Sequence, residues 1–218
     1  MTSHLHVLVA ASIAGGLACA ANAALVQVTI EGVVEYNQFQ SGPLAGQGAG
    51  SAVEISFLLD SASFVNDPSF PTRGYVIDQA SYVYRVGAAT LGLQSPFPAA
   101  STPYFVLRNN DPAVDGFFIA TDTAFPTGVP LSANGGFGAL RDQFSVTYLG
   151  STIPSLDILD AVGTYDFTGL TNFNFTISDG PFDPLGVVFS QMTIEVVPSP
   201  AALALLTPLA FARRRRRR

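Results

Sequence analysis

Carboxylates are the only abundant side chains in this chain of 218 residues that could act in catalysis, because it has sixteen Asp and Glu against two His and one Cys. A pair of carboxyl groups about 5–10 Å apart can hydrolyse a glycosidic bond when one of them keeps its proton near neutral pH. Most of these acids, such as Asp60, Asp67, Asp111 and Asp179, stand beside Asn, Ser, Pro or Gly. An aspartate there usually bonds its own backbone in a turn. A carboxylate-based glycoside hydrolase is therefore one alternative, with no catalytic residue assigned.

Histidine and cysteine occur only in the first 23 residues, as His4, His6 and Cys19. If that segment is removed, the remaining body has neither residue type. This rules out Ser-His-Asp and Cys-His nucleophilic sites within it. It also rules out zinc, copper, haem and iron–sulfur sites that need those ligands. We therefore predict no catalytic residues, no cofactor and no metal ligands.

Calcium binds through oxygen ligands alone, so the absence of His and Cys does not exclude a calcium site. The segment "NNDPAVDG" offers Asn109, Asn110, Asp111 and Asp115. It does not match the acidic spacing of a calcium-binding loop, and Pro112 restricts its backbone. We predict that this segment is an ordinary turn.

Sugar binding would need exposed aromatic rings with polar neighbours. Five aromatic residues near predicted turns are candidates: Tyr36, Phe39, Tyr75, Tyr104 and Phe182. Rings at such positions more often close the ends of a sandwich core. A carbohydrate-binding module is therefore the second alternative.

The charge is distributed unevenly along the chain. Six of the ten basic residues are Arg213 to Arg218, and the chain has no lysine. Between Ala24 and Val197 four arginines oppose all sixteen acids, a formal charge of −12 against −6 for the whole chain. A body this acidic repels phosphate backbones, so we predict no nucleic-acid partner.

The elements that would position any site are predicted to be strands. Apolar and polar residues alternate in six stretches: 26–31, 52–57, 82–86, 144–148, 172–178 and 191–196. Such alternation is typical of strands with one buried and one wet face. Turn-forming clusters separate them at 41–51, 66–74, 109–116, 126–136 and 178–186. The segment 155–163 reads as a short helix or a strand. Eight to ten short strands with such punctuation predict one antiparallel β-sandwich of jelly-roll or immunoglobulin-like type.

The N-terminus has the pattern of a secretory signal peptide. A short apolar run rich in small residues precedes Ala21-Asn22-Ala23, the A-x-A pattern of a signal-peptidase site, with cleavage before Ala24. The segment before the run, "MTSHLH", has no Lys or Arg. A lipoprotein signal at Cys19 is a weaker alternative, since Leu17 stands one place too late for it.

The C-terminus carries a short apolar segment backed by arginines. The twelve residues 201–212 would form a helix of about 18 Å, against roughly 30 Å of membrane hydrocarbon. Starting at Val196 extends this to about 26 Å, although Pro198 and Pro200 disfavour a helix there. Six arginines would remain on the cytoplasmic side. This predicts a marginal, temporary membrane span. A permanent tail anchor and a frayed end are the alternatives.

This C-terminal arrangement resembles the PEP-CTERM sorting signal of Gram-negative bacteria. The resemblance covers Val197, Pro198, Ser199 and Pro200, the apolar stretch, and the cluster Arg213, Arg214, Arg215, Arg216, Arg217 and Arg218. Ser199 stands where the family usually has Glu. The resemblance implies an exosortase-type membrane peptidase that removes the tail. It also implies a secreted or surface protein from a bacterium that makes extracellular polysaccharide and biofilm.

Together these patterns predict a signal helix at 1–23, one extracellular β-sandwich domain at 24–197, and an apolar C-terminal helix within a sorting signal at 198–218. The main hypothesis is an exported, non-catalytic surface or matrix protein that is anchored transiently in the inner membrane. Its expected partners are signal peptidase, the exosortase-type peptidase and extracellular polysaccharide.

Overall fold

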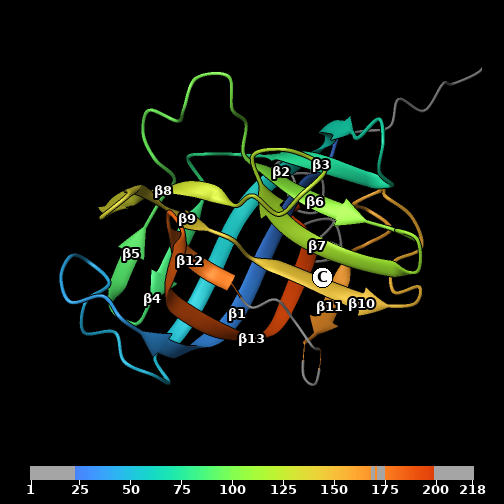
Figure 1. The fold of residues 1–218 in the computed structure, drawn as a ribbon. Helices are drawn as coiled ribbons and strands as arrows, with labels where there is room; N and C mark the ends of the chain where they lie inside the picture. The colour runs from blue at the N-terminus through green and yellow to red at the C-terminus, as the bar shows by residue number, and fades with distance from the viewer. Residues whose placement is uncertain (1–22, 168–169, 171–174, 199–218) are drawn as a thin grey trace, which may run out of the picture.

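The computed structural model describes residues 23–167, 170 and 175–198, and this part of the chain is all β. Its strands are antiparallel and form one continuous sheet (Figure 1). The strands are β1 (Leu25–Asn37), β2 (Ala52–Asn66), β3 (Thr72–Ile77), β4 (Val83–Val86), β5 (Ala89–Leu91), β6 (Tyr104–Arg108), β7 (Val114–Ala120), β8 (Val129–Gly135), β9 (Gly138–Asp142), β10 (Ser145–Leu149), β11 (Gly163–Asp166), β12 (Phe175–Asp179) and β13 (Phe182–Val196). The prediction of an all-β antiparallel fold is confirmed. The terminal helices predicted at 1–23 and 198–218 fall almost wholly outside the described residues.

The alternating pattern decides which face of each strand is buried. In β1, Val26, Val28 and Ile30 are fully buried, while the residues between them face outward. β2 repeats this pattern with Val53, Ile55 and Phe57 in its first half. The side-chain period of two therefore sends one apolar row of each strand into a common core.

The sheet is organised around three long strands, of which β1 is the middle one. It pairs with β2 on one side and with β13 on the other. The 15-residue strand β2 pairs with β4 along its first half and with β3 along its second. The equally long β13 pairs first with β12 and then with β11. Two groups of short strands thereby share the same three-stranded centre.

The sheet curls until strands far apart in sequence meet. Leu93, just after β5, forms an isolated antiparallel bridge with Leu131 of β8. Backbone hydrogen bonds on both sides of this bridge join Gln94 to Pro130 and Ser132 to Gly92, each at 2.9 Å. In Figure 1, β4 and β5 lie on the same side of the molecule as β8 and β9, and β10 and β11 lie on the opposite side. The curl encloses the apolar rows.

Aromatic rings from several strands form the centre of the core. Phe105 of β6 lies 5.5 Å from Phe57 of β2 and 5.8 Å from Phe117 of β7, between ring centroids. Tyr165 of β11 packs edge-on against Phe117 at 4.7 Å. Ring pairs at these separations add to the burial energy of the side chains themselves.

Five parts of the sequence-based assignment were wrong, namely the segment 155–163 and four of the turn clusters. The segment 155–163 forms turns, and only Gly163 belongs to a strand. The buried Tyr75 hydroxyl holds these turns, since it donates to the Leu156 carbonyl at 2.8 Å and accepts the Ile158 N–H at 2.9 Å. The presumed turn clusters 126–136 and 178–186 contain β8 and the start of β13, and the clusters 66–74 and 109–116 run into the starts of β3 and β7. Pairing with neighbouring strands overrode the local preference of Gly, Pro and Asn for turns.

Candidate functional site

The two predicted processing points lie at the same end of the sheet. Ala24 exchanges hydrogen bonds with Ser61: its N–H donates to the Ser61 hydroxyl at 2.8 Å, and its carbonyl accepts the Ser61 N–H at 2.9 Å. The Val197 N–H donates to the Leu25 carbonyl at 2.9 Å. Because Val26 pairs directly with Val196, the first and last paired residues of the fold are neighbours.

The other residues of the predicted terminal signals are placed only in part. Ala23 and Pro198 are exposed, directly outside the paired strands. Ala21, Ser199, Pro200 and the six arginines 213–218 lie outside the described residues. Within the part that is described, no helix is long and apolar enough to cross a membrane.

The carboxylates of the 109–116 segment already have partners within the protein. Asp115 is fully buried and accepts the N–H groups of Asn110 at 2.9 Å, Ile153 at 2.8 Å and Thr152. Asp111 forms an ion pair with Arg108 at 3.6 Å. The Asp115 carboxylate therefore ties two loops together and has its oxygens turned toward backbone donors.

The five candidate aromatic residues differ in accessibility. Tyr75 is fully buried, Phe39 packs against the main core, and Tyr104 packs against a small cluster of Val106, Phe118 and Ala120. Tyr36 is 39% exposed and Phe182 is 58% exposed. Only these last two of the five present much of a ring face to solvent.

Tyr36 lies flat on the outer face of the sheet. It pairs with Gly186 across β1 and β13, and a Cβ atom at Gly186 would overlap the Tyr36 ring. The glycine thus lets the ring rest directly on the backbone of β13. Partial burial raises the pKa of the Tyr36 hydroxyl, and the nearby carboxylates of Asp183 and Glu35 raise it further.

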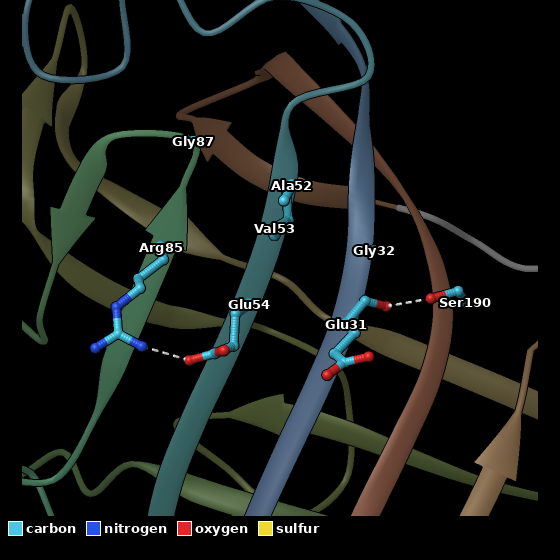
Figure 2. Close-up of a pocket in the computed structure, with 8 residues that line it drawn as sticks. All are labelled: Glu31, Gly32, Ala52, Val53, Glu54, Arg85, Gly87 and Ser190. Carbon is cyan, nitrogen blue, oxygen red and sulfur yellow. Dashed lines mark hydrogen bonds and ion pairs between the residues drawn. The ribbon is translucent and has the colours of Figure 1, made fainter.

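A groove of about 330 Å³ opens on the same outer face, where β4, β2, β1 and β13 run side by side (Figure 2). Its lining residues are Glu31, Gly32, Ala52, Val53, Glu54, Arg85, Gly87 and Ser190. This volume is at the lower end of the range of small-molecule sites, about 300–1,000 Å³.

Strand register brings the charged side chains of the groove into one row. Glu54 is directly opposite Arg85 on one side and Glu31 on the other, and Glu31 is opposite Gln191. Figure 2 shows Arg85 and Glu54 pointing toward one another, with Nη1 and Oε1 2.6 Å apart. Gln191 donates its side-chain amide to Glu31 at 3.0 Å. The row therefore places two carboxylates side by side between two hydrogen-bond donors, across four strands.

A β-bulge shapes the edge of the groove at β13. Glu31 pairs with Gln191 and Gly32 pairs with Phe189, so Ser190 has no residue opposite it. The Ser190 hydroxyl donates to the Glu31 carbonyl at 3.2 Å. The extra residue places this hydroxyl beside the backbone of Glu31.

Asp142 is the described carboxyl group whose pKa is raised. It is fully buried, and burial raises its pKa to about 7. The Tyr82 hydroxyl donates to one of its oxygens, and the Phe144 N–H donates to the other at 3.1 Å. Since no atom of Asp142 reaches solvent, it cannot protonate a bound polymer.

The sequence analysis did not single out Glu31, Glu54 or Arg85 as a group. The alternation of apolar and polar residues places each of these three side chains on a solvent-facing side of its strand. That was the signal that the sequence offered for them. Their convergence depends on which residues pair across strands, and register between distant strands cannot be read from alternation. No family model matches the chain, and no curated protein or solved structure does either.

Proposed function

We propose that this is an exported, non-catalytic surface or matrix protein, processed at both ends and associated with extracellular polysaccharide. The observation that carries this proposal is the position of the two ends of the fold. Among the described residues, hydrogen-bonded structure begins at Ala24 and ends at Val197, so both predicted processing segments adjoin the ends of the paired strands. Their removal would leave every strand pair of the body in place.

We infer a single sandwich of jelly-roll or immunoglobulin-like type, whose two layers are joined through β1, β2 and β13. A signal helix at 1–23 and an apolar helix after Pro198 complete the precursor. The apolar segment, followed by Arg213 to Arg218, would hold the chain briefly in the inner membrane of a Gram-negative cell until an exosortase-type peptidase acts.

The placement of the carboxylates supports a non-catalytic role. Glycosidic hydrolysis needs a protonated acid and a second carboxylate that both reach the substrate. Asp142 has the raised pKa, but it is sealed in the core. Glu54 in the groove is held by Arg85, and Glu31 by Gln191. The described carboxyl group whose pKa is raised therefore lies apart from the groove.

Expression in a Gram-negative host that encodes an exosortase tests this proposal. Three chains are compared: residues 1–218, residues 1–197, and a full-length variant with Ser at positions 213–218. We expect the first to leave the inner membrane with a mass that begins at Ala24 and lacks the tail. The second should stay in the periplasm, and the third should lose processing. Identical fractionation of all three, or an intact chain in the cytosol, would overturn the proposal.

A further inference from the structure

We propose that the outer face of β4, β2, β1 and β13 binds a neutral polysaccharide chain, with Tyr36 as a stacking platform and the Glu31–Glu54–Arg85 row as its polar groove. This inference rests on the proposed function, since it assigns a site to the expected association with extracellular polysaccharide. It concerns binding only, and no bond is made or broken.

The platform and the groove lie on one continuous surface. Glu31 and Val33 both point outward from β1, and Val33 pairs with Val188, whose side chain is also exposed. Tyr36 follows on the same strand and lies over Gly186. Tyr36 and Glu31 are five residues apart, which on an extended strand is about 16 Å. A ligand that contacts both must therefore be longer than one sugar ring.

The chemistry of the Tyr36 platform and of the Glu31–Glu54–Arg85 row fits a sugar chain. A sugar ring has an apolar face of C–H groups, which packs against an exposed aromatic face, and hydroxyls at its edge. A carboxylate has about four lone-pair positions, and a guanidinium has five N–H donors. The contacts within the row use only part of this capacity. Arg85 and Glu54 are 53% and 38% exposed, so their remaining positions can reach hydroxyl pairs.

The charge of the face selects against acidic polymers. The row has two carboxylates and one guanidinium, and the body as a whole has a formal charge of −12. A uronate polymer would bring further carboxylates against this surface and be repelled. The site is therefore assigned to neutral hexose polymers.

An array that carries neutral glucans, mannans and galactans beside alginate and polygalacturonate tests the assignment with the purified chain of residues 1–218. We expect binding to at least one neutral polymer and none to the uronates. Calorimetry with an oligosaccharide of that polymer then compares variants. Glu54→Gln should weaken binding roughly tenfold, since a hydrogen bond to a charged carboxylate is replaced by a weaker one to a neutral amide.

Tyr36 is examined with two substitutions because Tyr36→Ala alone uncovers the backbone at Gly186. Tyr36→Leu keeps this apolar cover but has no aromatic face, and Tyr36→Phe keeps the face. We expect Leu to weaken binding several-fold and Phe to retain most of it. Glu195→Gln, on the same face but outside the groove, and Phe125→Ala, an exposed ring elsewhere, are matched controls that should bind as the unaltered chain does.

The assignment is overturned if no neutral polymer binds, if only uronates bind, or if Glu54→Gln and Tyr36→Leu bind as well as the unaltered chain. Thermal unfolding of each variant shows whether a loss of binding is a loss of fold. Fractionation of the tail variants is measured separately, so a failure of sorting leaves the binding result intact, and the reverse holds too.

Discussion

Asp115 and Asp142 are equally buried but accept hydrogen bonds from different kinds of donor. Asp115 accepts three backbone N–H groups from two loops that are distant in sequence. Asp142 accepts one backbone N–H and one tyrosine hydroxyl, within a region otherwise lined by apolar strands. Burial alone therefore does not decide what role a carboxyl group has in the fold. The number and origin of the donors aimed at it decide which parts of the chain it ties together.

The largest expected effect is at the Asp115 tie. Asp115→Ala removes the acceptor of three N–H groups, and each unsatisfied buried donor costs about 1–3 kcal/mol. We expect a loss of about 3–5 kcal/mol in the free energy of unfolding, measured by urea denaturation. Asp111→Ala, which breaks the partly exposed pair with Arg108, should cost less than about 1 kcal/mol. Equal losses in the two variants would contradict the assignment.

The stability that Asp142 contributes to the fold is expected to depend on pH. Its pKa is about 7 in the folded protein and about 3.9 in the unfolded chain, so between these values the folded state binds more protons. The resulting contribution to stability is full below the unfolded pKa, falls as pH rises, and is gone above about 7. Asp142→Asn removes this titration. The unaltered protein should lose a few kcal/mol more than the variant between pH 4 and 8 in denaturation experiments. Parallel curves would exclude this role.

Tyr82→Phe removes one of the two hydrogen-bond donors of Asp142. The hydroxyl hydrogen bond lowers the pKa of Asp142, against the larger effect of burial. Its loss should destabilise the protein by about 1–3 kcal/mol at neutral pH, where the carboxylate form loses a donor. It should also move the midpoint of the stability change to higher pH. A midpoint shifted downward in the same denaturation series would be inconsistent with this geometry.

Tyr84→Phe should have the smallest effect, with the opposite sign. The buried Tyr84 hydroxyl has no hydrogen-bond partner among the described residues. Its removal relieves a desolvation cost, so we expect a gain of up to about 1 kcal/mol in thermal unfolding. Tyr75→Phe is the control, because that hydroxyl has partners at Leu156 and Ile158 and its removal should destabilise. If Tyr84→Phe lowered the thermal stability as much as Tyr75→Phe does, the Tyr84 hydroxyl would have a hydrogen-bond partner, and the prediction would be wrong.

The sequence predicted the strand faces well and the strand boundaries less well. In β1 and β2 the alternation identified each buried residue from Val26 to Ile30 and from Val53 to Phe57. It failed at β8, because Pro130, Asn134 and Gly135 prefer turns when judged locally. It failed again at 155–163, which was predicted to be a short helix or a strand but forms turns that bond the distant Tyr75 hydroxyl. The sequence-based candidates included Tyr36, but the groove beside it was not foreseen.

By itself, the sequence determined the alternating strands, the acidic stretch from Ala24 to Val197 without histidine or cysteine, and the apolar composition of the two terminal segments. These depend on residue type and short-range order, which a single chain displays directly. The tertiary structure alone decided that Ala24 and Val197 end beside one another, that Glu31, Glu54 and Arg85 form a row, and that Asp142 is sealed in the core. Each of these depends on register and curl between strands up to 160 residues apart, and period-two alternation is the same for many registers.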